Sequence, residues 1–342
     1  MRALRLLADR RLEIQDVPPP PPPGPGEVQI RVRAMALNHI DVWGWRGMAF
    51  AKRKLPLTVG AEAAGEIAEI GDGVAGYAPG AKVAMYGALT CGECRACRAG
   101  RDNLCENVGG VMGFHIDGFA QERVNMPARL VVPVPDDVPF RDAACAPITF
   151  GTTEHMLFDN AKLEAGEWVL VQAGGSGVGS SAIRLAKAAG ATVITTVGDE
   201  EKRRKALDLG ADHAVNYTED RFEGAVRKIT QKRGVDIVFE HVGAATWAGS
   251  LFSLRPGGRL VTCGSTTGVS AETNLFQIFQ RQLRIIGSFG CRIDNLRTGL
   301  AKMAANVARP VIDTELPLDD FAQGLERLES RRVFGKIVIH VQ

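Results

Sequence analysis

Residues 168–179, WVLVQAGGSGVG, decide the fold of the second half of the chain. The first four form an uninterrupted apolar run, which is typical of a strand buried on both faces. A glycine-rich segment follows without a gap, and a helical pattern then runs over 178–189. A strand, a tight glycine turn and a helix in this order predict a dinucleotide site, because the turn lets a pyrophosphate approach the backbone and the helix N-terminus attracts its charge.

The glycine turn matches a variant of the Gly-x-Gly-x-x-Gly spacing, since Ser176 stands at its middle position. A glycine-rich turn without a ligand is the alternative, and the strand and helix around it favour the ligand. The cofactor contacts expected in the turn are Gly174, Gly175, Ser176, Gly177, Val178 and Gly179.

Strand-like and helical segments alternate beyond this turn. Further strands are expected at 191–197, 214–215, 235–240, 259–263 and 283–287, with helices between most of them, one at 201–209. This alternation predicts an α/β fold with a doubly wound, six-stranded parallel sheet. A helix at 316–328 and a strand at 336–341 leave the alternation, so we expect the tail to return to the first domain.

The first half of the chain has a different texture, with short strands separated by glycine and proline turns. Residues 28–33 alternate strictly between apolar and polar, as a half-buried strand does. Other strands are expected at 66–70, 82–85, 119–124 and 129–134. Many short strands of this kind predict a small β-barrel or sandwich.

Composition and charge exclude several classes of partner. The 342 residues carry 41 Lys and Arg against 39 Asp and Glu, and no stretch combines basic residues with aromatics, so no nucleic-acid partner is expected. Apolar runs stay shorter than the roughly 20 residues of a membrane span, and we expect no membrane association. The start, MRALRLLADRRLEIQD, has no apolar signal-peptide core. A cytoplasmic location is the resulting expectation.

Four of the seven cysteines gather in one short segment: Cys91, Cys94, Cys97 and Cys105. Four thiolates brought together by short turns predict a closed tetrahedral zinc site with a structural role. An iron–sulfur cluster is the competitor, but its motifs end in a shorter spacer followed by Cys-Pro. Disulfides are the third alternative, and a reducing compartment disfavours them.

The end of the second strand of the parallel sheet bears on the choice of dinucleotide. It reads TTVG over 195–198, without the acidic residue that accepts the ribose hydroxyls of NAD. Asp199 comes next and argues for NAD, whereas Lys202 and Arg203 suit the 2′-phosphate of NADP or a solvated helix face. We expect NADP, with NAD as the alternative. Further cofactor contacts are expected at Gly198, Lys202, Arg203, Tyr217, His241, Cys263, Gly264, Phe289 and Lys336.

Taken together, the chain resembles the zinc-type alcohol dehydrogenases, or medium-chain dehydrogenase/reductase superfamily. The resemblance covers the whole chain and rests on the segments 23–28 (PGPGEV) and 60–65 (GAEAAG), the cysteine lobe, the glycine turn and the closing 335–338 (GKIV). It implies a GroES-like β-barrel domain at 1–149 with a zinc lobe at about 88–108, a Rossmann domain at 150–291 and a C-terminal return at 292–342. It also implies an NAD(P)-dependent oxidoreductase acting on a small molecule, as a homodimer or homotetramer with 274–286 as the contact region.

The family holds its catalytic zinc with an early Cys, a His in a Gly-His-Glu segment, and a Cys or Asp before the cofactor domain. This chain has Asn38, Ala61 and Ile148 at those places. Because these residues cannot replace two thiolates and an imidazole, we expect no catalytic zinc. The same departures resemble the quinone oxidoreductase and enoyl reductase branches, which pass hydride from NADPH to an activated double bond without a metal.

A second local likeness concerns the substrate. Residues 236–243, DIVFEHVG, resemble one strand of the crotonyl-CoA carboxylase/reductases, which adds enoyl thioesters to quinones and enones as candidates. The candidate catalytic residues are Asn38 as an amide donor, His39 and His115 as proton donors, Asp41 and Glu62 as polar anchors, and Thr149 as a nicotinamide contact. Trp43, Trp45 and Phe50 are candidates for an apolar pocket wall or for the core.

Two other functions stay open at this point. One is a zinc-dependent alcohol dehydrogenase that uses unusual ligands among His39, Asp41, Glu62 and His115, since imidazoles and carboxylates also bind zinc. The other is a non-catalytic NADP-binding protein, because a fold does not dictate its function.

Overall fold

Apolar side chains alternate along β3 (Glu27–Ala36), and its Val28, Ile30 and Val32 are fully buried. In the computed structural model, which describes residues 1–48 and 53–342, β3 is the hub of a seven-stranded sheet of order β15-β16-β3-β5-β6-β8, with β7 also paired to β3. The other strands are β5 (Ala63–Ile70), β6 (Lys82–Met85), β7 (Arg123–Pro127), β8 (Val131–Pro133), β15 (Ile312–Pro317) and β16 (Lys336–His340). A second sheet of order β2-β1-β4 is built from β1 (Arg2–Ala8), β2 (Arg11–Asp16) and β4 (Leu57–Thr58).

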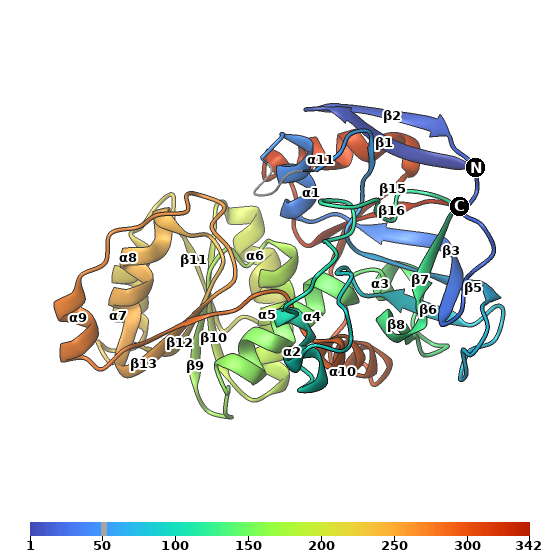
Figure 1. Cartoon of the computed structure of the whole chain (residues 1–342). Coiled ribbons are helices and arrows are strands. Elements are labelled where there is room, and N and C mark those ends of the chain that lie inside the picture. Colours follow the sequence, from blue (N-terminus) through green and yellow to red (C-terminus); the bar gives the residue numbers. More distant parts are fainter. Residues whose placement is uncertain (49–52) are drawn as a thin grey trace. The chain divides into compact units, whose positions relative to one another are not determined.

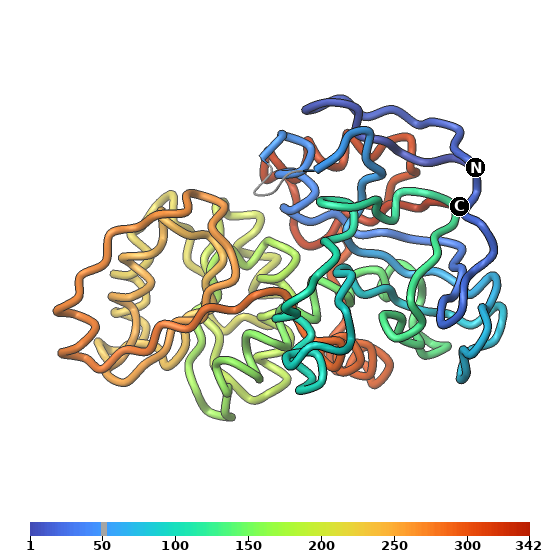
Figure 2. Tube along the Cα trace, viewed as in Figure 1, coloured from blue at the N-terminus to red at the C-terminus, as the bar shows by residue number. Residues whose placement is uncertain are grey.

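The C-terminal strand β16 pairs antiparallel with β3, so the two ends of the chain share one sheet. Figure 2 shows this as a red segment beside the blue N-terminal trace. The helical segments near these sheets are α1 (His39–Trp45), α2 (Arg95–Arg98), η1 (Asp102–Leu104), η2 (Ala128–Leu130), α3 (Phe140–Ala143), the π-helix η3 (Ala146–Phe150), α10 (Ile293–Ala304), η5 (Leu318–Asp320) and α11 (Phe321–Glu329).

Two compact units result from these contacts. The first comprises Met1–Gly151, Cys291–Asn306 and Ile312–Gln342, and the second Thr152–Gly290 and Val307–Val311. Our division into functional domains at 1–149, 150–291 and 292–342 stays a prediction. None of the helices in the described part of the chain has the length and apolar character that a membrane span requires.

A parallel sheet of order β11-β10-β9-β12-β13-β14 forms the centre of the second unit and confirms the predicted six strands. Figure 1 shows α5 and α6 on one face of it and α7 and α8 on the other. The strands are β9 (Trp168–Val171), β10 (Thr192–Val197), β11 (His213–Asn216), β12 (Val235–Glu240), β13 (Leu254–Thr262) and β14 (Arg284–Gly287). The helices are α4 (Gly151–Glu154), η4 (His155–Asn160), α5 (Gly177–Ala188), α6 (Glu200–Asp208), α7 (Phe222–Ile229), α8 (Ala244–Ser253) and α9 (Leu275–Gln280).

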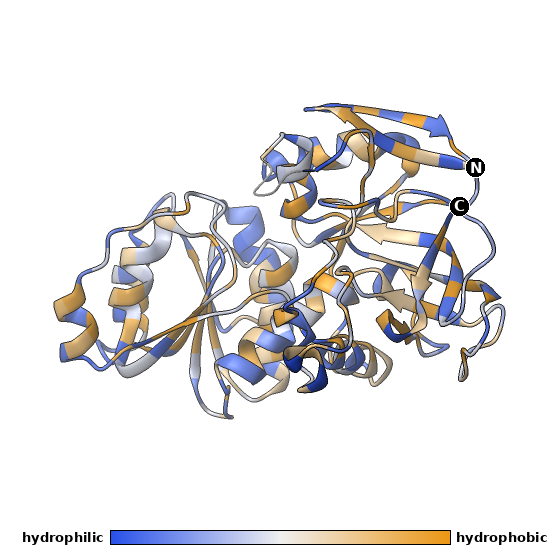
Figure 3. Ribbon diagram, viewed as in Figure 1, coloured by the Kyte–Doolittle hydropathy of each residue, from blue (hydrophilic) through white to orange (hydrophobic). Residues whose placement is uncertain are grey.

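Hydropathy explains how this sheet is covered. Leu170, Ile194 and Val238 of the central strands are fully buried and pack with Phe222 and Val226 of α7. Figure 3 shows the strands as mainly apolar and α6 as mainly hydrophilic. The continuous apolar runs of these strands follow from burial on both faces, as in other doubly wound sheets.

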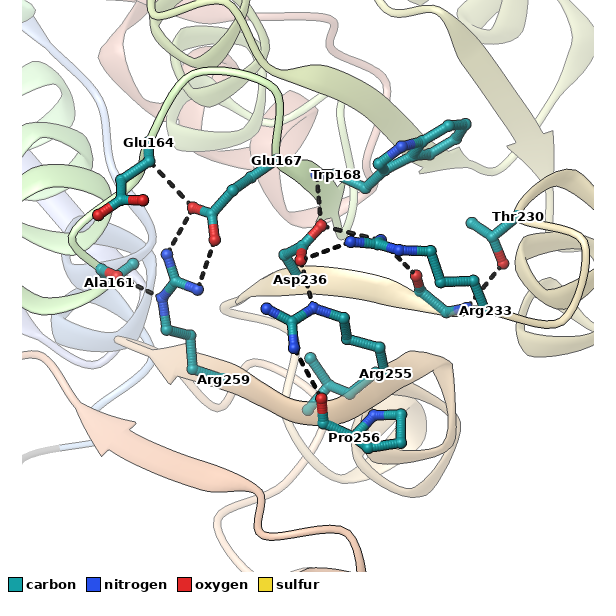
Figure 4. Close-up of polar contacts among 12 residues, drawn as sticks. Ala161, Glu164, Glu167, Trp168, Thr230, Arg233, Asp236, Arg255, Pro256 and Arg259 are labelled. Atoms are coloured by element: carbon teal, nitrogen blue, oxygen red, sulfur yellow. Dashed lines mark hydrogen bonds and ion pairs between the residues drawn. The ribbon is translucent and has the colours of Figure 1, made fainter.

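Ion pairs close the edge of the sheet where β9 and β12 begin (Figure 4). Asp236 accepts a hydrogen bond from the backbone N–H of Trp168 at 2.8 Å, pairs with Arg233 at 2.9 Å, and also pairs with Arg255. Glu167 and Arg259 form a second pair at 2.6 Å. These charges lie at the amino-terminal ends of the strands, opposite the glycine turn, so we assign them a structural role.

Three predicted elements were wrong in part, and one of them is the strand expected at 129–134, which begins only at Val131 because the residues before it form the 3-10 helix η2. The strand expected at 119–124 begins only at Arg123, because Phe119 and Ala120 donate backbone hydrogen bonds to Gly60 and Val59 in an irregular pairing. The helix expected at 316–328 begins at Phe321, because the residues before it, up to Pro317, form β15 against β16.

Candidate functional site

The glycine turn in the second unit is shaped by close packing. A Cβ atom on Gly174 would come within 2.2 Å of Thr195 Oγ1, and one on Gly179 within 2.3 Å of the Ala173 carbonyl oxygen. Ser176 is the N-cap of α5, and its Oγ accepts a hydrogen bond from the N–H of Gly179 at 2.9 Å. The turn therefore brings backbone and a helix N-terminus to the carboxyl edge of the sheet, which fits the pyrophosphate of a dinucleotide.

Other predicted cofactor residues of the second unit lie at the same edge. Each follows the carboxyl end of one parallel strand: Gly198 after β10, Tyr217 after β11, His241 after β12, Cys263 and Gly264 after β13, and Phe289 after β14. In open α/β sheets this is the edge at which ligands bind. Their contact with a cofactor stays a prediction.

His241 is held in one tautomer. Its Nε2 lies 2.8 Å from the carbonyl oxygen of Gln172, which can only accept, so Nε2 carries the proton. Nε2 also lies 3.4 Å from Ser176 Oγ. Burial lowers the pKa of this imidazole, and the neutral ring then has Nδ1 as its acceptor.

The end of β10 combines acidic and basic groups. Asp199 is the N-cap of α6, and its Oδ1 accepts the N–H of Lys202 at 2.7 Å. The Lys202 ammonium lies 3.8 Å from the same carboxylate. Arg203 pairs with Glu200 at 2.8 Å and donates to the Ala214 carbonyl oxygen at 3.2 Å. The carboxylate that argued for NAD thus has a structural role as a helix cap.

A buried polar cluster in the first unit surrounds Glu62, whose side chain is fully buried. Oε1 of Glu62 accepts the backbone N–H groups of Ile148 and Thr149 at 2.6 and 2.7 Å. Oε2 accepts from Asn38 Nδ2 at 2.8 Å and Thr149 Oγ1 at 3.2 Å, and it pairs with the Lys336 ammonium at 3.0 Å. Both carboxylate oxygens are thus occupied by protein donors rather than open to a metal ion.

Lys336 is predicted as a cofactor contact, and it lies in this cluster. Its ammonium also donates to the Leu37 carbonyl oxygen at 2.7 Å and to Asn38 Oδ1 at 2.8 Å, so its three hydrogens all have acceptors here. A cofactor contact requires Lys336 to give up one of them. Asn38 is similarly engaged, because its Nδ2 donates to the Ala36 carbonyl oxygen at 3.1 Å as well as to Glu62.

Asp41 lies beside the cluster and is 6% exposed. Its Oδ2 accepts the backbone N–H of Asn38 at 2.8 Å, while Oδ1 is buried without a hydrogen-bond partner among the described residues. Burial raises the pKa of Asp41 to about 7. A carboxyl group that is half protonated near neutrality is suited to proton transfer.

The remaining predicted catalytic residues lie on other segments. His39 is the first residue of α1 and is half-buried. His115 lies in the loop before β7, where its Nδ1 accepts the N–H of Val111 at 3.1 Å and burial lowers its pKa. Trp45 is in the core, and Phe50 lies outside the described residues.

The four lobe cysteines converge although they come from separate turns. Their sulfur atoms all lie within 4.8 Å of one another, and Cys91 Sγ is 3.9 Å from Cys97 Sγ and 3.5 Å from Cys105 Sγ. Four sulfurs about 2.3 Å from a tetrahedral zinc would be about 3.8 Å apart. All seven cysteines are free, so the disulfide alternative is not realised. The lobe fits a structural zinc.

Backbone donors prepare this lobe for thiolates. The pKa of Cys94 is lowered to about 6, chiefly because its sulfur accepts the N–H groups of Cys97 and Glu106. Burial raises the pKa of Cys97 to about 12, and a bound cation would favour its thiolate. Among the residues that the structure describes, this is the one cluster of three or more His, Cys, Asp or Glu side chains with metal-binding proximity.

Sequence reasoning missed the partners of Glu62 and gave no role to Glu240. Lys336 is 274 residues from Glu62, so no local sequence pattern predicts that the two residues pair. Glu240 had a usable signal, because it is a charged residue directly after the apolar run 237–239, at the end of β12.

A glycine turn at the carboxyl edge of a six-stranded parallel sheet and a four-cysteine lobe define the class: a nicotinamide-dependent dehydrogenase or reductase. Comparison with known proteins agrees. The alcohol dehydrogenase GroES-like domain matches residues 24–136, and the zinc-binding dehydrogenase family matches 177–306.

Individual relatives extend the match over nearly the whole chain. L-threonine 3-dehydrogenase of Rhizobium rhizogenes is 34% identical over 311 residues, which cover 88% of this chain and 86% of the relative. Acryloyl-coenzyme A reductase of Metallosphaera sedula is 31% identical over 296 residues, 85% of each chain. A crystal structure of an NAD-dependent alcohol dehydrogenase superposes with a TM-score of 0.95 at 40% identity and covers 100% of both chains. The chain therefore belongs to the zinc-type alcohol dehydrogenase superfamily and is an NAD(P)-dependent oxidoreductase with a GroES-like and a Rossmann domain.

Proposed function

We propose that this oxidoreductase reduces an activated carbon–carbon double bond with NADPH and without a catalytic metal. The observation that carries the proposal is the cluster around Glu62. The family's three ligand positions hold Asn38, Ala61 and Ile148, and the Glu62 carboxylate is neutralised by Lys336 instead. An amide, a methyl group and an aliphatic side chain do not provide a zinc site.

The reaction adds a hydride to the β-carbon, places negative charge on a carbonyl oxygen, and takes up a proton at the α-carbon. The bound cofactor supplies the hydride, and the chain supplies polar contacts and the proton. The residues proposed for these contacts are Asn38, His39, Asp41, His115 and Thr149. Asp41 suits the proton transfer because burial raises its pKa to about 7.

The substrate class follows from the same chemistry. Enones, quinones and enoyl thioesters all carry a carbonyl group that stabilises the developing charge. The acryloyl-coenzyme A reductase relative supports the thioester member of this class. We therefore rank an enoyl thioester first among the three.

NADP is the proposed dinucleotide. The strand β10 ends without an acid, and the carboxylate of Asp199 is engaged in capping α6. Lys202 and Arg203 stand one turn further on, where they can meet a 2′-phosphate.

The test combines metal content with a matched pair of assays on the purified chain. Elemental analysis is expected to give one zinc per chain. NADPH oxidation is then measured with crotonyl-CoA, an enone and a quinone, and NADP reduction with ethanol and L-threonine. The proposal is supported if the protein turns over an alkene substrate and added zinc does not increase the rate.

Two zincs per chain together with alcohol oxidation would overturn the proposal in favour of a zinc-dependent dehydrogenase. The names of the threonine and alcohol dehydrogenase relatives favour that second candidate, whose ligands would come from His39, Asp41, Glu62 and His115. Binding of NADPH without turnover of any substrate would identify a non-catalytic protein.

We also propose a homodimer or homotetramer built through 274–286. Leu275, Phe276 and Phe279 of α9 are 71%, 57% and 65% exposed, and β14 is the terminal strand of its sheet. In Figure 3 the ribbon of α9 is coloured mainly as apolar, with hydrophilic segments between. Light scattering is expected to find an oligomer that Phe276→Glu with Phe279→Glu converts to monomer, and a monomeric wild type would contradict this.

A further inference from the structure

A buried carboxylate lies beneath the glycine turn and has no role in the function proposed above. Glu240 ends β12 and is fully buried. Its Oε1 accepts the N–H of Val242 at 2.7 Å and that of Gly243 at 3.1 Å. Thr246 Oγ1 lies 3.0 Å from both carboxylate oxygens. These groups are all donors, which suits a group that only accepts.

A chain of hydrogen bonds runs from this carboxylate to the turn. Ser250 Oγ donates to Glu240 Oε2 at 2.6 Å and accepts from Gln172 Nε2 at 3.0 Å. Gln172 Oε1 accepts from Thr196 Oγ1 at 2.7 Å. Thr196 Oγ1 accepts the backbone N–H of Ala173 at 2.9 Å. Gln172 and Ser250 are fully buried and Thr196 is 2% exposed, so water does not compete with these bonds.

The chain of hydrogen bonds has a direction. From Ala173 through Thr196, Gln172 and Ser250, every donated hydrogen points towards the carboxylate of Glu240. A hydroxyl has one hydrogen to donate, so the orientation of each member depends on the next one. The acceptor at the end therefore sets the polarity of the whole chain.

The far end of the chain is the first residue of the turn. Ala173 has φ of +48°, a left-handed conformation that costs a non-glycine residue energy and needs support from its surroundings. The neighbouring Gln172 also holds the imidazole of His241 through its carbonyl oxygen. Backbone orientation at 172–173 thus affects both the glycine turn and the His241 ring.

We infer that Glu240 is a positioning residue for the dinucleotide: through Ser250, Gln172 and Thr196 it fixes the Ala173 amide in the orientation that shapes the glycine turn. The inference rests on the proposed binding of NAD(P) at this turn. Glu240 touches neither the substrate nor the cofactor in this role.

Glu240→Gln tests the direction of the chain without creating a cavity. The new amide oxygen is retained by the N–H groups of Val242 and Gly243, so the NH₂ group faces Ser250. The Ser250 hydroxyl then accepts a hydrogen bond from this NH₂ group and must donate its own hydrogen to Gln172. The side-chain amide of Gln172 therefore flips, so that its oxygen accepts from Ser250 and its NH₂ group donates to Thr196. The hydroxyl of Thr196 now receives two donors, and its own hydrogen loses its acceptor beside Ala173.

The experiment measures the Kd of NADPH and of NADH by fluorescence titration for wild type, Glu240→Gln, Ser250→Ala and the double variant. Thr246→Val is the matched control, because Thr246 contacts the same carboxylate but is not part of the chain. Hydrogen exchange of the Ala173 amide in the cofactor-free protein provides a second readout. Thermal unfolding verifies that each variant folds.

Glu240→Gln and Ser250→Ala are each expected to raise the Kd about tenfold and to speed Ala173 exchange, as coupled neighbours do. The Kd of the double variant is expected to be no higher than that of the single variant with the higher Kd. The Kd of Thr246→Val is expected to equal that of wild type. The inference would be overturned if the Kd increases of the two single variants multiplied in the double variant, or if Thr246→Val raised the Kd as much as Glu240→Gln does. Wild-type protein that binds neither nucleotide would instead refute the dinucleotide site itself, while Ala173 exchange still reports on the chain.

Discussion

Removing the buried cation of the first unit is expected to be severely destabilising. In Lys336→Met the Glu62 carboxylate loses the counter-charge of the Lys336 ammonium while it stays buried, and the side chains of the pair are 3% and 0% exposed. Breaking a buried ion pair from one side costs about 3–5 kcal/mol, since an uncompensated charge remains. At about 2–4 °C per kcal/mol for a unit of this size, the Tm is expected to fall by about 6–20 °C.

The assay is urea denaturation and thermal unfolding followed by circular dichroism, with Lys187→Met as a control. Lys187 pairs with Asp212 at 2.8 Å, but their side chains are 33% and 35% exposed, and such a pair contributes at most about 1 kcal/mol. Adding Glu62→Gln to Lys336→Met removes the stranded charge and is expected to restore part of the stability. If Lys336→Met lost no more stability than the Lys187→Met control, the assignment of a buried ion pair would be refuted.

Three further predictions concern the lobe, the cofactor and pH. Cys97→Ser is expected to lower zinc content and stability while the NADPH Kd stays unchanged, and full zinc retention would contradict a structural site. Lys202→Ala with Arg203→Ala is expected to weaken NADPH by about tenfold or more and NADH far less; equal losses would remove the case for NADP. For Asp41, burial raises the pKa from 3.8 to about 7, so its contribution to stability is present below pH 4 and is lost as pH rises to 7. Asp41→Asn should therefore gain stability relative to wild type over that range, by up to about 4 kcal/mol at 1.36 kcal/mol per pKa unit, and parallel pH profiles would exclude this.

The parallel sheet could be predicted from the sequence because its strands are buried on both faces. The expected strands 168–171 and 235–240 match the bounds of β9 and β12. Segments that depend on distant partners were harder. Pro317 ends a strand that exists because β16 lies beside it, and no helical pattern at 316–328 reveals that partner.

In the candidate site, too, features that are local in sequence were predictable and features that depend on distant partners were not. The glycine turn and the cysteine lobe are local in sequence, and their spacing was enough to predict them. The engagement of Asn38 was not predictable, because its partner Lys336 is 298 residues away. The sequence predicted that the family's zinc ligands are missing, but only the structure shows the side-chain nitrogen of Lys336 beside the Glu62 carboxylate there.

The pairing of β16 with β3 also constrains the order in which the chain can be completed during synthesis. Almost all of the second unit is one continuous segment, Thr152–Gly290, whereas the first unit needs segments from both ends. A continuous unit can acquire its native contacts as soon as it has left the ribosome. The cluster around Glu62, in contrast, waits for Lys336, so a nascent chain can carry a formed nucleotide-binding sheet well before the polar cluster of its other unit exists.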